Sequence, residues 1–138
     1  MSANEPIRIL VIDDDPGVRG LLTILFEREG WAVTTAADGE VALEQIARVR
    51  PDVVVLDLML PKRTGLEVIR QIAEQDDGTA EKVLVLTAIS EAQLRRLPVD
   101  LHVRKLMRKP FDNAELLQSV KACGSRVDAR AGMRSARR

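Results

Sequence analysis

Four short apolar runs, separated by longer segments with helical periodicity, constrain the fold of this chain more than any other feature of its sequence. The runs cover residues 7–12, 31–35, 53–56 and 83–86. Nearly continuous apolar or β-branched residues are typical of parallel strands that are buried on both faces. Strands that alternate with helices form βαβ units with right-handed crossovers. The sequence therefore predicts a three-layer α/β fold, with a parallel sheet covered by helices on both faces.

The segments between the runs place apolar residues three and four positions apart, as on one face of a helix. Start and stop signals agree with these helices. Pro16 follows Asp15, as in a first helical turn, Ser90 and Gln93 form a capping-box pattern, and Gly30 is typical of a helix stop. The predicted apolar faces comprise Val18, Leu21, Leu22 and Leu25; Ala42, Leu43 and Ile46; Leu66, Ile69, Ile72 and Ala73; and Leu116, Leu117 and Val120.

Residues 90–108 follow this pattern least well. A partial helical face interrupted by Pro98 predicts a short, poorly anchored helix. A fifth strand is predicted within residues 103–108, where Arg104, Lys105 and Arg108 surround the few apolar residues. The topology argues for this strand more than its own pattern does.

Length and composition favour one compact domain, because the chain has 138 residues and 46% hydrophobic composition. The single cysteine, Cys123, excludes an intramolecular disulfide framework, and the first residues lack the basic and apolar pattern of a secretion signal. No apolar run approaches the roughly 20 residues that span a bilayer. We therefore expect a soluble, cytoplasmic protein without a membrane partner.

The folded domain is predicted to span residues 7–123, after an amino-terminal extension of residues 1–6. Gly124 resembles a helix stop, and residues 124–138 combine Ala, Ser, Gly and Arg without apolar periodicity. Such a segment predicts a basic, disordered tail. It is too short for a DNA-binding domain and has no aromatic residues, so we do not expect nucleic acid as a partner.

Polar residues stand where the predicted strands end. Asp13 and Asp14 follow the first run, Asp57 follows the third, Thr87 follows the fourth, and Lys109 follows the weak fifth strand. Ligands bind at the carboxyl edge of such a sheet, where these side chains are expected to meet. Aspartate and threonine at a strand end often only cap the next helix. Their occurrence together on successive strand ends favours a functional site.

Three carboxylates in one place cost free energy unless a cation occupies the site or one carboxyl stays protonated. Mg²⁺ prefers oxygen ligands and is commonly held by one or two carboxylates together with phosphate oxygens. A carboxylate can also attack phosphorus and form an aspartyl phosphate. Lys109 can supply an ammonium to the phosphoryl group, and the Thr87 hydroxyl and the Ala88 backbone N–H can donate hydrogen bonds to it.

These residues lie in segments that resemble the receiver domains of two-component response regulators, over residues 7–123. The segments are 9–19, with the acid pair, 57–65, with the loop after Asp57, 86–88 and 109–111. The resemblance implies a flavodoxin-like sheet of five parallel strands in the order 2-1-3-4-5. It also implies a signalling protein that catalyses only its own phosphorylation and dephosphorylation and is not classed as an enzyme.

The resemblance assigns roles to single residues. Asp57 would accept a phosphoryl group from a sensor histidine kinase or a phosphotransfer protein. Asp14, Asp57 and the Met59 carbonyl would bind Mg²⁺, for which Mn²⁺ can substitute, and Asp13 would act through water. Thr87, Lys109 and the Ala88 N–H would bind the phosphoryl group. The signal would pass to a downstream protein through altered protein contacts.

The chain departs from the family pattern after Thr87. Leu106 stands three positions before Lys109, where the family commonly has an aromatic residue, and the sequence has no tyrosine. The usual coupling of an aromatic ring to threonine movement cannot operate in that form.

In relatives the stretch after Thr87 often supplies a dimer face, but here it is basic and would repel its own copy. We expect a monomer or a weak phosphorylation-dependent dimer, and hypothesise an acidic partner; a solvated charged face is the alternative. The basic residues are Arg95, Arg96, Arg104, Lys105 and Arg108.

Two other functions fit part of the sequence. The pattern Asp13-x-Asp15 resembles aspartate-nucleophile phosphatases of the haloacid-dehalogenase type, but this reading leaves Asp57 unexplained. The chain could also be the receiver fragment of a longer transcription regulator. Partner choice in receivers depends on the first helix, where Arg19, Leu22 and Phe26 are the predicted surface residues.

Overall fold

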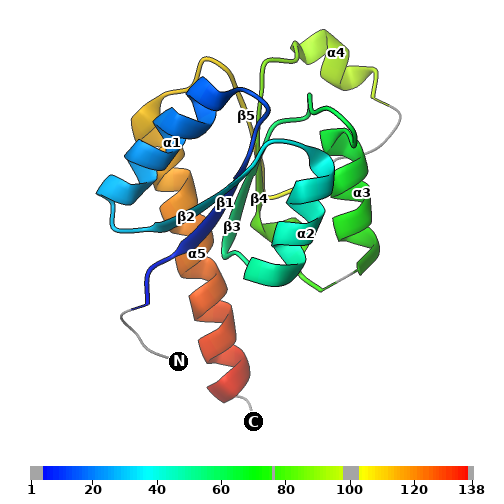
Figure 1. Ribbon diagram of the computed structural model, residues 1–138. Coiled ribbons are helices and arrows are strands. Elements are labelled where there is room, and N and C mark those ends of the chain that lie inside the picture. Colours follow the sequence, from blue (N-terminus) through cyan, green and yellow to red (C-terminus); the bar gives the residue numbers. More distant parts are fainter. Residues whose placement is uncertain (1–4, 76, 98–102, 137–138) are drawn as a thin grey trace.

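The computed structural model describes residues 5–75, 77–97 and 103–136, with side chains up to residue 124. Figure 1 shows a central sheet with helices on both sides. The elements are β1 (Arg8–Ile12), α1 (Pro16–Arg28), β2 (Ala32–Ala36), α2 (Gly39–Val49), β3 (Val53–Leu56), α3 (Gly65–Gln75), the 3₁₀ turn η1 (Thr79–Lys82), β4 (Val83–Thr87), α4 (Glu91–Arg95), β5 (Lys105–Arg108) and α5 (Asn113–Ala136).

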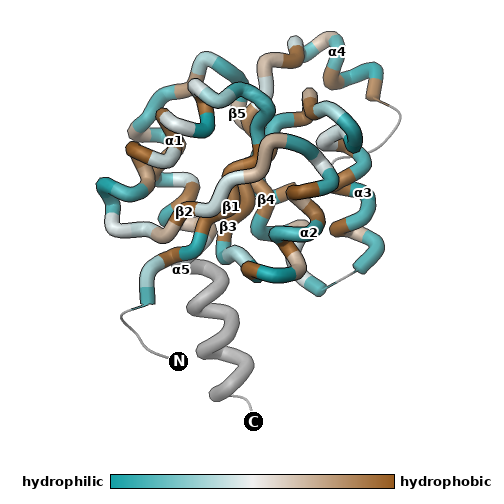
Figure 2. The backbone as a smooth tube through the Cα atoms, viewed as in Figure 1, coloured by the Kyte–Doolittle hydropathy of each residue, from teal (hydrophilic) through white to brown (hydrophobic). Residues whose placement is uncertain are grey.

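The five strands form one parallel sheet in the order β2-β1-β3-β4-β5, which confirms the predicted fold class and strand order. Successive residues of a strand face opposite sides of a sheet, so β1 serves two cores. Leu10 and Ile12 pack with α2 and α3, whereas Ile9 and Val11 pack with α1 and α5. Figure 2 shows the central strands β1, β3 and β4 as strongly hydrophobic.

Helix α1 is fixed at its start by the predicted signals. Pro16 occupies the first helical turn, and the Asp15 carboxylate accepts a hydrogen bond from the Gly17 N–H at 2.8 Å. The prediction of its surface residues was wrong: Leu22 and Phe26 are buried in the core, 1% and 0% exposed. They lie four residues apart and face the sheet, whereas Leu21 and Ile24 point outward and are 47% and 55% exposed. Sequence spacing alone did not separate Leu21 from Leu22.

The region after β4 is confirmed as the weakly anchored part of the fold. Helix α4 has only five residues, and none of its side chains is buried. Its start carries the full predicted capping box, in which Ser90 accepts from the Gln93 N–H and Gln93 accepts from the Ser90 N–H. The predicted fifth strand forms as β5 at the sheet edge. Pro98 lies outside the described residues.

Helix α5 differs from its prediction at the carboxyl end. The sequence predicted a stop at Gly124 and a disordered tail, but the backbone remains helical to Ala136. Gly124 serves close packing instead, because a Cβ on this residue would lie 2.7 Å from Cδ1 of Ile7. The division into extension, domain and tail stays a prediction. Within the residues described here, no helix is long and apolar enough to cross a membrane.

Candidate functional site

Four strand ends, those of β1, β3, β4 and β5, deliver the candidate site residues to one edge of the sheet. Sheet-like hydrogen bonds continue one residue past β1, β3 and β5: the Asp13 N–H donates to Ala36 O at 3.1 Å, and the Asp57 N–H donates to Ile12 O at 2.9 Å. The Lys109 N–H donates to Thr87 O at 2.8 Å. The backbone of each residue is therefore held by the neighbouring strand, which sets the direction of its side chain.

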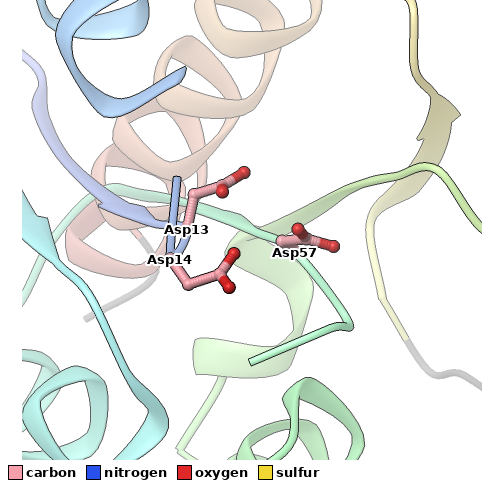
Figure 3. A group of neighbouring side chains, drawn as sticks. All are labelled: Asp13, Asp14 and Asp57. Atoms are coloured by element: carbon pink, nitrogen blue, oxygen red, sulfur yellow. The ribbon is translucent and has the colours of Figure 1, made fainter. Parts of the chain in front are cut away.

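The three predicted carboxylates converge. Oxygen atoms of Asp13, Asp14 and Asp57 lie within 4.8 Å of one another. Figure 3 shows Asp13 and Asp14 projecting from the end of β1 beside Asp57, which follows β3. Asp13 and Asp57 are 3% and 7% exposed, whereas Asp14 is exposed. A cluster of hard oxygen donors that is open on one side matches the ligand preference of Mg²⁺, so the residues present fit this ion.

Lys109 joins the two buried carboxylates. Its Nζ lies 2.7 Å from Asp13 Oδ2 and 3.2 Å from Asp57 Oδ2. Burial by itself would lower the pKa of Lys109, but the hydrogen bond to Asp13 and the charges of Asp57 and Asp13 outweigh it, and the pKa is raised. The ammonium therefore stays charged at neutral pH, with a contact to the residue predicted to carry the phosphoryl group.

The loop between β3 and α3 is shaped around Asp57. The Met59 N–H donates to Asp57 Oδ1 at 3.1 Å, and the Gly65 N–H donates to Leu58 O at 3.0 Å. A Cβ on Gly65 would lie 2.5 Å from Asp57 O and from Leu58 Cα, so only glycine permits this approach of α3.

The same loop is also attached to the start of α2. Lys62 Nζ lies 3.6 Å from Asp38 Oδ2, and Gly39 packs against the Arg63 carbonyl so closely that a Cβ would clash with it. Asp38 also caps α2 through the Val41 N–H, and this hydrogen bond is the main cause of its lowered pKa. Contacts on two sides therefore fix the loop that carries Met59.

Thr87 lies at the end of β4, beside β3, and is fully buried. Its hydroxyl oxygen accepts a hydrogen bond from the Ile89 N–H at 3.3 Å. A hydroxyl that accepts still carries a hydrogen to donate. The next residue, Ala88, is exposed at the same edge.

Sequence reasoning missed one residue that supports the acid pair. The Arg19 guanidinium donates from Nη1 to the Asp13 carbonyl at 2.7 Å, and the Asp15 N–H donates to Asp13 Oδ1 at 2.9 Å. Arg19 lies one helical turn after Asp15, whose carbonyl accepts its N–H. The spacing of four residues indicated that Arg19 lies near the start of α1, but it did not specify the contact with Asp13. The Asp15 carboxylate caps α1 by accepting the Gly17 N–H.

An acid pair with one buried member, an aspartate after the next strand and a lysine after the edge strand lie together, and the comparison with protein families agrees with this arrangement. Residues 9–121 match the model of the response regulator receiver domain. The chain belongs to this family. Receivers are generally not classed as enzymes, and the acidic pocket of Asp13, Asp14 and Asp57 is typical of the family's metal site.

Several response regulators are similar to this receiver in sequence. It is 43% identical over 117 residues to the response regulator MprA of Mycolicibacterium vanbaalenii, covering 85% of this chain and 50% of MprA. It is 41% identical over 115 residues to the alkaline phosphatase synthesis transcriptional regulatory protein PhoP of Bacillus subtilis, covering 83% of this chain and 47% of PhoP. The receiver thus spans about half the length of these relatives.

Solved structures share its fold. The receiver domain of the Francisella response regulator 1452 superposes with a TM-score of 0.79 at 28% identity, covering 88% of this chain and 98% of that one. The signal receiver domain of a putative Luxo repressor protein from Vibrio parahaemolyticus superposes with a TM-score of 0.83 at 23% identity, covering 93% and 97% of the two chains.

Proposed function

We propose that this receiver accepts a phosphoryl group on Asp57, in a Mg²⁺-dependent reaction, from a phosphohistidine of a sensor kinase or phosphotransfer protein. The observation that carries this proposal is the setting of Asp57. Its carboxylate is nearly buried, 3.2 Å from an ammonium and clustered with two further carboxylates that can hold a cation. Asp13 shares the ammonium, but Asp57 follows β3, the strand that lies between β1, with the acid pair, and β4, with Thr87.

In the proposed reaction, an oxygen of Asp57 forms a bond to phosphorus while the P–N bond of the phosphohistidine breaks. The electron pair returns to the donor imidazole, which takes a proton from solvent. Mg²⁺ held by Asp14, Asp57 and the Met59 carbonyl, and through water by Asp13, would neutralise charge on the phosphoryl oxygens; Mn²⁺ would serve similarly.

The remaining groups bind the phosphoryl oxygens. Lys109 neutralises their charge from the side of β5, and its raised pKa keeps it available as a cation. Thr87 donates its hydroxyl hydrogen, and the Ala88 N–H is a further donor. The transfer depends on position and charge more than on proton transfer, which is why a site without histidine suffices.

The proposed product is the phosphorylated receiver itself, which acts as a signal. In this proposal a cytoplasmic receiver changes its contacts with a downstream protein when Asp57 is modified. Because the relatives it matches are about twice as long and include named transcriptional regulators, the same event would control an effector domain if this receiver is part of a longer chain.

Intact mass spectrometry after incubation with acetyl phosphate and Mg²⁺ tests the proposal. We expect one phosphoryl group per chain, no label in Asp57→Ala, and normal label in the matched control Asp15→Asn, because an asparagine at this position can still cap α1. Label that persists in Asp57→Ala would place the acceptor elsewhere. Steady phosphate release without an adduct would favour the phosphatase instead.

A further inference from the structure

The edge of the receiver formed by α4 and β5 carries an excess of positive charge. Residues 90–108 contain five Arg or Lys residues and only two acidic ones, Glu91 and Asp100. We call this set the basic edge. Its members are Arg95, Arg96, Arg104, Lys105 and Arg108. Four of them are exposed, and Arg104 is half-buried.

Most of this charge is not neutralised within the protein. Lys105 Nζ lies 3.4 Å from Glu115 Oε1 and donates to Ser119 Oγ at 3.1 Å. Among the residues that the structure describes, the four arginines of the basic edge form no ion pair. The arginines therefore remain available to a partner.

Strand alternation spreads the charge over both sides of β5, which is the last strand of the sheet. Leu106 packs in the core on the α4 side and Met107 in the core on the α5 side. Lys105 therefore shares the α5 side with Met107, and Arg108 shares the α4 side with Leu106. Arg95 and Arg96 extend the same charge along the end of α4. A partner that approaches this sheet edge meets cations on either flank.

The basic edge is also connected to the site by the chain itself. Arg108 is the register partner of Thr87 and directly precedes Lys109, and α4 begins four residues after Thr87. No side chain of α4 is buried, so this helix can shift at little cost. A structural change at the site, at Asp57, Thr87 or Lys109, can therefore be passed over a few residues to the cations of the basic edge.

From this arrangement we infer that the basic edge binds an acidic segment of a partner protein. A second copy is a poor occupant, because a two-fold contact would bring the same cations face to face. A nucleic acid is also a poor occupant, because no aromatic residue stands on α4 or β5 to stack against bases. The partner at the output step would thus be a protein with an acidic segment. That this contact carries a signal rests on the proposed function.

Binding of a fluorescent poly-glutamate peptide at low salt tests the inference on the unmodified chain. The variant Arg95→Gln/Arg96→Gln/Arg108→Gln is expected to bind about tenfold more weakly, since exposed charge pairs contribute a fraction of a kcal/mol each. The matched control Arg28→Gln/Arg48→Gln/Arg70→Gln removes as many exposed arginines from α1, α2 and α3. It should change binding by less than about twofold.

Three results would overturn the inference. Equal weakening by both triple variants would show attraction to overall charge only. A tight dimer through this edge in sedimentation would make the occupant a second copy, and tighter binding of an oligonucleotide of equal charge would make it a nucleic acid. The charge-reversed variant Arg95→Glu/Arg96→Glu should lose poly-glutamate binding and gain poly-lysine binding. A gain of binding requires a folded protein, so this variant separates loss of charge from misfolding. Phosphoryl incorporation is measured separately, so either proposal can fail alone.

Discussion

Helices α1 and α4 hold equivalent places in the chain but are built very differently. Each follows a strand end that carries site residues, and each begins with a side-chain cap. Helix α1 runs for 13 residues and buries Leu22 and Phe26, whereas α4 has five residues and buries none. A good cap therefore starts a helix, whereas burial of an apolar face holds the helix in place.

This contrast suits a phosphoacceptor. The acid pair needs a rigid support, which α1 provides through its buried face and through Arg19, bonded to the Asp13 carbonyl. The proposed output side would need an element that responds to small changes, and elements with few buried apolar contacts open most easily. Half-buried Leu94 is one of the few anchors of α4 on the core.

The largest effect is expected from removing an anchor on the rigid side. Phe26→Ala should lower the free energy of unfolding by about 3–5 kcal/mol, because it leaves a cavity under α1. Leu94→Ala should cost less than about 2 kcal/mol, because its side chain is only partly buried. Urea unfolding of the two variants measures the difference. Ile24→Ala, at an exposed site of α1, is the control and should be nearly neutral. Equal losses at Phe26 and Leu94 would remove the contrast.

The sequence predicted well the rigid side of the fold, which holds α1 and the strands β1 and β3. These two strands are continuous apolar runs, and each is followed by aspartate. Asp13, Asp14 and Asp57 could be placed together from the topology of a parallel sheet alone. The edge strand β5 was harder, since its pattern mixes cations with two apolar residues that face different cores. Its existence was predicted from the topology, and its position was predicted only within a window.

Two kinds of feature could not be predicted from the sequence: which face of a helix is buried, and which residues meet in tertiary contacts. Both Leu21 and Leu22 fit an apolar stripe, and only packing against the sheet decides which one is buried. Gly124 has the residue type of a helix stop, yet its value here is the absence of a Cβ beside Ile7. The bond from Arg19 to the Asp13 carbonyl requires a known loop shape, which no spacing rule specifies.

Lys109 follows β5 and contacts Asp13 and Asp57, so it connects the two regions. Its substitution should have an effect of intermediate size. Lys109→Gln removes the ammonium from Asp13 and Asp57 and should destabilise the protein without divalent ions. Because the folded pKa of Lys109 is raised, its stabilisation is fully present below the ordinary value of 10.5 and is lost as pH rises through the folded pKa. The deficit of the variant should therefore shrink towards high pH.

Urea unfolding from about pH 8 to about pH 11.5 measures this dependence for both proteins. Lys121→Gln, at an exposed position of α5, is the control and should follow the wild type at every pH. Added Mg²⁺ should also reduce the deficit, since it would replace the lost positive charge at the carboxylates. A deficit that stays constant with pH and Mg²⁺ would show that the lysine acts by packing alone.

The smallest change in stability is expected from removing the helix caps, Asp15 of α1 and Ser90 of α4. Asp15→Ala should cost about 1 kcal/mol of global stability, because α1 unfolds only with the core it covers. Ser90→Ala removes a similar bond, but α4 opens locally before the rest of the protein, so the global free energy should change by less than about 0.5 kcal/mol. Amide hydrogen exchange should instead speed up within α4 alone. Should Ser90→Ala lower global stability as much as Asp15→Ala does, α4 would be part of the cooperative core. The basic edge would then lack the mobility by which Thr87 is proposed to influence it.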